Sequence, residues 1–246
     1  IPETSKPRVV IIGGGFAGIS FIKQLEGQEV QFVLFDRHNY HTFQPLLYQV
    51  STAGLEPDSI AYPLRKIFRK NSNIDATKNR IKTNIGNLTY DYLVIATGTR
   101  TNFFGNKEIE ENSMPMKTVP QALNIRSLML QNIEEADSTE DKEKRERLLN
   151  FVVVGGGPTG VELAGALVEF RKGILENDYP ELEEEDMHVH LLEGGDKILA
   201  PFSERASRKA QEFLENLGVE IHLNTVVESY DGTIAKTKNG KEFATE

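Results

Sequence analysis

Glycines recur with one spacing at two places in the chain. The pattern G-x-G-x-x-G occurs at Gly13, Gly15 and Gly18 and again at Gly155, Gly157 and Gly160. At a dinucleotide site the first glycine permits a tight turn, the second lets the backbone approach a pyrophosphate, and the third lets a helix pack closely on a strand. One copy is a weak signal, but each copy here follows four apolar residues and opens a helical pattern. The chain is therefore predicted to bind two dinucleotides.

An acidic residue is expected beyond each glycine turn, at the end of the next strand, to hold the adenosine ribose. Asp36 lies 23 residues past its first glycine, close to the usual spacing of about 20. Glu193 lies 38 residues past its own, and we attribute the excess to an acidic loop at 181–186. Gly194 and Gly195 follow Glu193, with no arginine there to receive a 2′-phosphate, which indicates NADH rather than NADPH.

Two strand–turn–helix–strand units must position these residues. The predicted strand, helix and strand lie at 9–12, 16–25 and 30–36 in the first unit and at 151–154, 161–170 and 189–192 in the second. This order predicts an α/β fold with two Rossmann-like βαβ dinucleotide-binding units and parallel sheets. A further buried strand is predicted at 92–95, and a charged helix or linker at 138–147.

The C-terminal part is predicted to add one helix and a small antiparallel β-meander. Apolar residues from Glu204 to Leu217 have helical spacing, and Gly218 is placed to end that helix. Asp231-Gly232 and Asn239-Gly240 are typical of hairpin turns.

Composition narrows the chemistry. Among 246 residues, 28 are basic and 37 acidic, so the net charge of −9 disfavours binding to nucleic acid. No cysteine occurs, which excludes a disulfide, an iron–sulfur cluster or a redox-active cysteine pair within this stretch, so redox chemistry requires a bound cofactor. Because no signal peptide or long apolar run is found, we expect a cytosolic chain that does not span a membrane.

Three stretches resemble one protein family. Asp36–Val50 closely resembles the sequence around the flavin in type II NADH:quinone oxidoreductases, members of the two-dinucleotide-binding flavoprotein superfamily. Tyr90–Gly98 resembles the strand and turn that contact FAD in the superfamily, and Gly155–Glu162 resembles the NADH-binding turn. The resemblance implies that residues 1–110 form the first, incomplete part of an FAD-binding domain and residues 111–246 an NAD(H)-binding domain.

The same resemblance assigns roles to individual residues. FAD contacts fall on Gly13, Gly15, Phe16, Ala17, Gly18, Asp36, Arg37, Tyr40, Ala96, Thr97 and Gly98. NADH contacts fall on Gly155, Gly157, Pro158, Thr159, Gly160, Glu193 and Gly194. The expected catalytic residues are Glu162, near the nicotinamide, and Tyr48 or Gln49, beside the isoalloxazine or quinone pocket.

By this resemblance the parent protein passes hydride from NADH to FAD and then two electrons to a membrane quinone, without pumping protons. It is expected to be a homodimer on the cytoplasmic face of the cell membrane, held there by a C-terminal amphipathic region. Family members continue past residue 246 with a second FAD-contacting segment, so the chain is expected to be an N-terminal fragment. The stretch from Asn73 to Ile81 is also shorter than the family pattern and is expected to lack a strand between Ile74 and Asp75.

Other interpretations remain open from the residues. One is a soluble reductase of the same superfamily, which gives its electrons to a ferredoxin-like protein; another is a protein that senses NADH without turnover. His38 and His41 fit hydrogen bonding or turn structure better than proton transfer. His188 and His190 alternate on a strand, but no further ligand is close in sequence, so no metal site is predicted.

Overall fold

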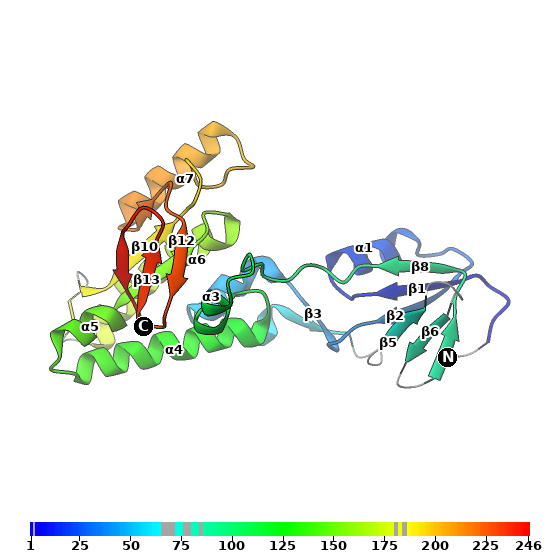
Figure 1. Ribbon diagram of the computed structural model, residues 1–246. Helices are drawn as coiled ribbons and strands as arrows, with labels where there is room; N and C mark the ends of the chain where they lie inside the picture. Colours follow the sequence, from blue (N-terminus) through cyan, green and yellow to red (C-terminus); the bar gives the residue numbers. More distant parts are fainter. Residues whose placement is uncertain (2, 65–71, 76–79, 84–85, 180–181, 184–185) are drawn as a thin grey trace. The chain divides into compact units, whose positions relative to one another are not determined.

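The computed structural model describes residues 1, 3–64, 72–75, 80–83, 86–179, 182–183 and 186–246. They form two compact units (Figure 1). The first comprises Ile1–Phe43 and Pro57–Arg100, and the second comprises Gln44–Glu56 and Thr101–Glu246. Each unit contains one of the two glycine motifs.

The first unit is built on a three-stranded parallel sheet. Strand β1 (Arg8–Ile12) lies between β2 (Gln31–Phe35) and β8 (Tyr92–Ile95), and helix α1 (Phe16–Gln24) connects β1 to β2. Residues 9–11 of β1 are almost fully buried, as expected for a parallel strand covered on both faces. The first βαβ unit and the strand at 92–95 are confirmed.

Two antiparallel sheets complete the first unit. One pairs β3 (Tyr40–Thr42) with β4 (Ala61–Pro63), which follows the short helix η2 (Pro57–Ser59). The other contains β5 (Ser72–Asp75), β6 (Arg80–Thr83) and β7 (Gly86–Thr89), and its Ile81 and Leu88 pack against the parallel sheet. The predicted shortening near 73–81 falls partly on residues 76–79, which lie outside the described residues.

The second unit repeats the parallel plan in the order β11–β10–β9. Its elements are β9 (Asn150–Val154), α6 (Pro158–Asp178), β10 (His188–Leu192), α7 (Glu204–Leu217) and β11 (Glu220–His222). The second βαβ unit is confirmed, and so is α7, which ends at Gly218 in the left-handed conformation. A large core, with Val189 and Leu191 fully buried, lies between this sheet and its helices.

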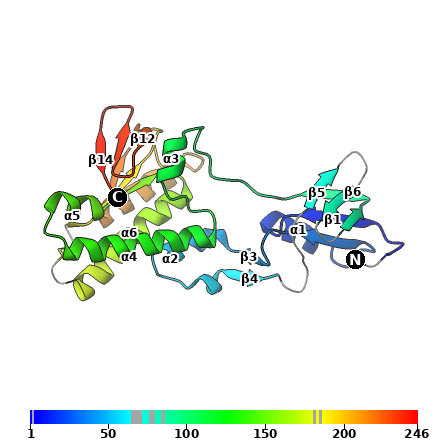
Figure 2. The same cartoon turned by 60° about the horizontal axis from the view of Figure 1, so that its bottom comes forward.

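Further elements complete the second unit. Helices η1 (Gln44–Leu46), α2 (Leu47–Ser51), α3 (Lys107–Asn112), α4 (Val119–Ser138) and α5 (Lys142–Leu148) precede β9 along the chain. Helix α2 packs against α4 and α6 (Figure 2). The predicted meander is confirmed as β12 (Val227–Tyr230), β13 (Ile234–Thr237) and β14 (Glu242–Ala244). None of the described helices combines the length and apolar character needed to cross a membrane.

Candidate nucleotide-binding sites

The two glycine turns start in the same way. The first glycine of each motif has a left-handed backbone, with φ of +111° at Gly13 and +106° at Gly155. Only glycine adopts this conformation without strain. The Gly13 N–H donates to the Phe35 carbonyl over 2.7 Å, and the Gly155 N–H donates to the Leu192 carbonyl over 2.8 Å. Each turn is thereby tied to the end of the neighbouring parallel strand.

The third glycine of each motif lets a helix lie against its turn. A Cβ atom at Gly18 would lie 2.0 Å from the Gly13 carbonyl oxygen, and one at Gly160 would lie 2.0 Å from the Gly155 carbonyl oxygen. Real Cβ atoms essentially never come closer than 3.0 Å to such an atom. Any larger residue would therefore push α1 or α6 away from the strand before it.

The second glycine of each motif borders open space. A Cβ atom at Gly15 or Gly157 would meet no heavy atom within 4 Å. Each of these glycines directly precedes a helix, whose first N–H groups have no partner inside the helix and favour an anion. The geometry therefore leaves room for a pyrophosphate beside both helix N-termini, and it fits a dinucleotide.

The two acidic residues occupy equivalent positions. Asp36 accepts hydrogen bonds from the Gly14 N–H at 2.5 Å and the His38 N–H at 2.7 Å. Glu193 accepts from the Gly156 N–H and the Gly195 N–H, both at 2.6 Å. Each carboxylate thus lies directly beside its glycine turn, where ribose hydroxyls could replace backbone N–H donors.

The number of residues between the first glycine and the carboxylate differs between the two motifs, and the acidic loop is not the main cause of this difference. Helix α6 contains 21 residues and α1 only 9, so the longer helix accounts for most of the excess. The prediction that an acidic loop causes the longer spacing is therefore largely wrong. Residues 181, 184 and 185 of that loop lie outside the described residues. Despite the spacing, Glu193 reaches the same place as Asp36.

The middle glycines, Gly14 and Gly156, also help to form the two turns, and the motif analysis missed them. Their N–H groups bind the two carboxylates, and their would-be Cβ atoms would lie 2.8 Å from a Leu64 methyl and 2.9 Å from an Ile198 methyl. A signal for them was present, because both motifs contain three consecutive glycines where the pattern requires only two.

The other predicted FAD residues surround the first turn. Phe16 and Ala17 open α1 and are exposed, and the Phe16 ring packs edge-on against His41 and Phe43. His41 Nδ1 lies 3.0 Å from the Gly14 carbonyl oxygen, which gives this histidine a hydrogen-bonding role.

Beyond the strands, two short segments also border this end of the sheet. Arg37 is exposed after β2, and Tyr40 on β3 stacks on His38. The segment Ala96–Gly98 follows β8, and the Ala96 carbonyl oxygen would lie 2.1 Å from a Cβ at Gly13. The first turn is therefore closed on one side by this segment.

The predicted NADH residues lie at the second turn. Pro158 and Thr159 begin α6 and are exposed, Glu162 follows one turn later, and Gly194 lies just after Glu193. Nearby residues exclude part of the water from the Glu162 carboxyl, and this desolvation raises its pKa. A carboxyl so placed holds a proton more readily than an ordinary glutamate.

Tyr48 and Gln49 lie on α2, within the second compact unit. The Gln49 amide donates to the Tyr48 hydroxyl over 3.2 Å, and both side chains are partly exposed. Their helix α2 packs against α6, the helix that carries Glu162.

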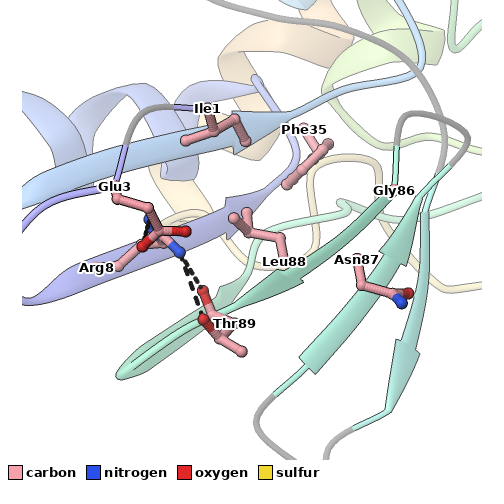
Figure 3. A pocket seen from close by; sticks show the side chains of 8 residues that line it. All are labelled: Ile1, Glu3, Arg8, Phe35, Gly86, Asn87, Leu88 and Thr89. Carbon is pink, nitrogen blue, oxygen red and sulfur yellow. Dashed lines mark hydrogen bonds and ion pairs between the residues drawn. The ribbon is translucent and has the colours of Figure 1, made fainter.

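A shallow hollow of about 250 Å³ lies elsewhere in the first unit (Figure 3). It is lined by Ile1, Glu3, Arg8, Phe35 and β7, and the Arg8 guanidinium donates to Thr89 inside it. Arg8 begins β1, whereas the glycine turn follows the other end of that strand. The hollow is therefore not the predicted nucleotide site.

Comparison with known sequences settles the family. The profile of the pyridine nucleotide-disulphide oxidoreductases matches residues 7–246. The chain belongs to this family. Despite the family's name, the 246 residues contain no cysteine.

Individual members of the family are also similar. Type II NADH:quinone oxidoreductase NdhA of Mycobacterium tuberculosis is 37% identical over 251 residues, which cover 96% of this chain and 53% of the relative. The mitochondrial external alternative NAD(P)H-ubiquinone oxidoreductase B2 of Arabidopsis thaliana is 35% identical over 97% of this chain and 45% of its own length. The chain thus spans about half the length of the curated relatives it matches, and the resemblance stated from the motifs is confirmed.

Solved structures agree on the fold. NDH2 from Plasmodium falciparum in complex with NADH matches with a TM-score of 0.87 at 23% identity, over 98% of this chain and 53% of that one. Sulfide:quinone oxidoreductase from Aquifex aeolicus matches with a TM-score of 0.74 at 19% identity, over 97% of this chain and 57% of that one. At these identities the likeness establishes the architecture alone.

Proposed function

We propose that this chain is the part of a flavin-dependent NADH:quinone oxidoreductase that binds both nucleotides. FAD occupies the first glycine turn and NADH the second. The observation that carries this proposal is the duplicated site: two turns with the same hydrogen bonds, each beside a carboxylate and an open helix N-terminus. The names of the similar proteins support NADH as donor and a quinone as acceptor.

The chain's residues would bind both nucleotides in the same manner. The Asp36 and Glu193 carboxylates accept hydrogen bonds from ribose hydroxyls, and the N-termini of α1 and α6 bind the pyrophosphates. Glu193 also selects the donor, because its negative charge repels the 2′-phosphate of NADPH. The exposed residues Pro158 and Thr159 border the path of NADH along α6.

Bound FAD would supply the redox chemistry, accepting hydride from NADH and releasing two electrons to the quinone. The protein's part is to position both nucleotides and to control charge beside them. Glu162 would lie near the nicotinamide, and desolvation raises the pKa of its carboxyl there. Tyr48 and Gln49 would border the isoalloxazine or quinone pocket through a hydroxyl and an amide.

The location and assembly of the whole protein are also proposals. A quinone acceptor lies in a lipid bilayer, so we propose that the protein works at a membrane surface as a peripheral homodimer. The protein would bind the cytoplasmic face of the cell membrane through a C-terminal amphipathic region.

The function is tested by mixing the purified, FAD-loaded protein with NADH and a water-soluble quinone. NADH oxidation that depends on the quinone, with NADPH used more slowly, is the expected result. Oxidation that requires a ferredoxin-like acceptor instead would favour the soluble reductase. Stoichiometric NADH binding without any oxidation would favour a sensor and contradict the proposal.

A further inference from the structure

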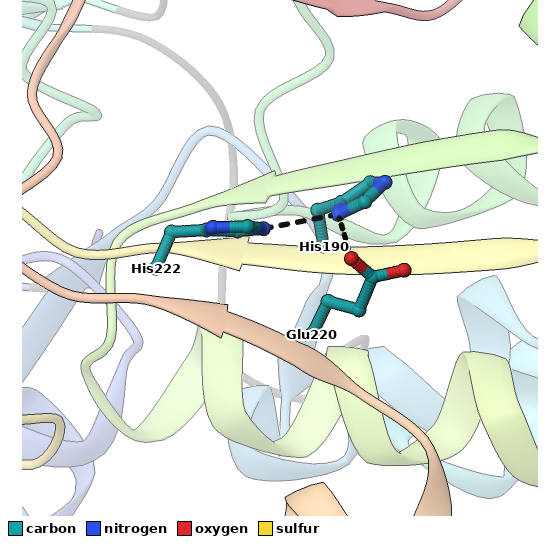
Figure 4. A group of neighbouring side chains, drawn as sticks. All are labelled: His190, Glu220 and His222. Carbon is teal, nitrogen blue, oxygen red and sulfur yellow. Dashed lines mark hydrogen bonds and ion pairs between the residues drawn. The ribbon is translucent and has the colours of Figure 1, made fainter. Parts of the chain in front are cut away.

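Three polar side chains meet on one face of the second parallel sheet. His190 is on β10, and Glu220 and His222 are on β11. In the parallel register His190 is paired with Glu220, and residues two apart on a strand point to the same face. Figure 4 shows the Glu220 and His222 side chains directed toward the His190 ring. The fold thus brings His190 to a carboxylate and a second histidine that lie 30 and 32 residues later in the sequence.

His190 lies at metal-ligand spacing from each of the other two groups. His190 Nδ1 lies 3.1 Å from His222 Nε2 and 3.4 Å from Glu220 Oε2, and all three ligand atoms lie within 4.8 Å of one another. A tetrahedral zinc ion with bonds of about 2.0–2.1 Å has ligand atoms roughly 3.3–3.4 Å apart. The two pairs that include His190 are close to this value, and the Glu220 and His222 ligand atoms lie within 4.8 Å of each other.

Hydrogen bonds alone cannot give every polar atom of this cluster a favourable partner. His190 Nδ1 carries at most one proton, yet it faces both a carboxylate oxygen and the Nε2 atom of His222. A cation would instead accept one lone pair from each of the three atoms.

Neighbouring side chains hold the three groups in place. The Phe243 ring packs against both imidazoles, with centroids 5.2 Å from His190 and 5.0 Å from His222. His188 Nδ1 lies 3.2 Å from Glu220 Oε1, the carboxylate oxygen that faces away from His190. A metal ligand is commonly oriented by such an outer hydrogen bond.

We propose that His190 Nδ1, His222 Nε2 and the Glu220 carboxylate bind one divalent transition-metal ion, with water as the fourth ligand. Two imidazoles and one carboxylate suit Zn²⁺, Ni²⁺ or Cu²⁺ and do not suit Mg²⁺ or Ca²⁺, which prefer oxygen ligands. The ion would tie β10 to β11 beside Glu193, whose N–H donates to the His222 carbonyl. His188 is a positioning residue, since it contacts Glu220 alone among the three ligands by hydrogen bond.

The test is a calorimetric titration of the tag-free, metal-stripped protein with Zn²⁺ and separately with Mg²⁺. One equivalent of Zn²⁺ should bind, and Mg²⁺ should not. His222→Ala and Glu220→Gln should each weaken Zn²⁺ binding at least tenfold, whereas His38→Ala, a histidine outside the cluster, should leave it unchanged. Co²⁺ bound in place of Zn²⁺ should give the visible absorption of a tetrahedral ion, which is lost in His222→Ala.

Either of two outcomes would overturn the proposal. They are the absence of saturable Zn²⁺ binding by the wild-type protein, and equal Zn²⁺ affinity in the wild type and in Glu220→Gln. Glu220 is exposed and glutamine has nearly its shape, so this variant keeps the fold even if a histidine variant does not. Circular dichroism of each metal-free variant separates loss of the ligand from loss of structure. His188→Ala should weaken binding less than His222→Ala, because it removes no metal ligand.

Discussion

The second and third glycines of the NADH turn should respond to the same added methyl group in opposite ways. In Gly160→Ala the new Cβ would lie 2.0 Å from the Gly155 carbonyl oxygen. In Gly157→Ala the new Cβ would meet nothing within 4 Å, and the backbone there has no positive φ. We therefore predict that Gly160→Ala damages the fold and that Gly157→Ala damages nucleotide binding.

The expected magnitudes follow from these contacts. Relief of the Gly160 clash moves α6 by at least about 1 Å, and overpacking of this kind costs about 1–3 kcal/mol. For a chain of this length that lowers Tm by roughly 2–12 °C. Gly157→Ala lowers the conformational entropy of the unfolded chain, which stabilises the folded protein by about 0.4–1 kcal/mol. This gain offsets the small loss of stability caused by alanine in place of glycine at the start of the helix. Its Tm should stay within about 2 °C of the wild type, while its methyl fills the space left for the pyrophosphate.

Thermal unfolding followed by circular dichroism measures the loss of stability in Gly160→Ala. Fluorescence titration with NADH measures the loss of affinity in Gly157→Ala. Gly157→Ala should weaken NADH binding at least tenfold, or about 1.4 kcal/mol. The reasoning is refuted if Gly157→Ala binds NADH as tightly as the wild type does, or if Gly160→Ala melts at the wild-type temperature.

Three further predictions concern carboxylates. Glu193→Gln should weaken NADH binding about 5–30-fold, because the hydrogen bonds of this side chain lose their ionic component. The variant should also prefer NADH over NADPH less strongly than the wild type does. Titration with both nucleotides checks this, and unchanged affinities would contradict it. Asp36→Asn should lower the FAD content of the purified protein but leave the NADH affinity unchanged, so Asp36→Asn and Glu193→Gln each serve as the control for the other. If either variant lowered FAD content and NADH affinity equally, the two sites would not be separate. Desolvation raises the pKa of Glu162 above its ordinary 4.5, so the folded protein holds this proton more tightly than the unfolded chain does. The free energy of unfolding should therefore fall as pH rises from about 4.5 through the folded pKa, and Glu162→Gln should remove this fall in urea denaturation at a series of pH values; the same fall in the variant would show that another group causes it.

The parallel βαβ units could be predicted from sequence because their signals are local. A buried parallel strand is a short apolar run, and each run here ends at a glycine cluster. Helix α7 matched its prediction at both ends, since Ser203 caps its N-terminus and Gly218 ends it. The positions of Asp36 and Glu193 beside the glycine turns could be predicted for the same reason, because each follows a recognisable strand.

Helix α4 escaped prediction, although its start carries a local signal. Thr118 and Gln121 form a capping box, and Pro120 lies in the first turn. Its apolar face is weak, because Asn132 is among its buried residues and charged residues follow. The pattern along this helix therefore did not separate it from a linker.

The histidine cluster could not be predicted from spacing alone. His190 and His222 meet only because β10 and β11 pair in parallel with a particular register. That register depends on how α7, which connects the two strands along the chain, packs against α6 and β11, and this is tertiary information. A weak signal existed, since His188 and His190 alternate on one strand and Glu220 and His222 on the next.

The most direct test of two cooperating nucleotide sites is the addition of NADH to the FAD-loaded protein under strictly anaerobic conditions. NADH should bleach the visible flavin absorption within the mixing time, and a quinone added afterwards should restore it. Gly157→Ala, which keeps the FAD turn intact, should bleach only at much higher NADH. Bound NADH with an unbleached flavin in the wild-type protein would contradict the account.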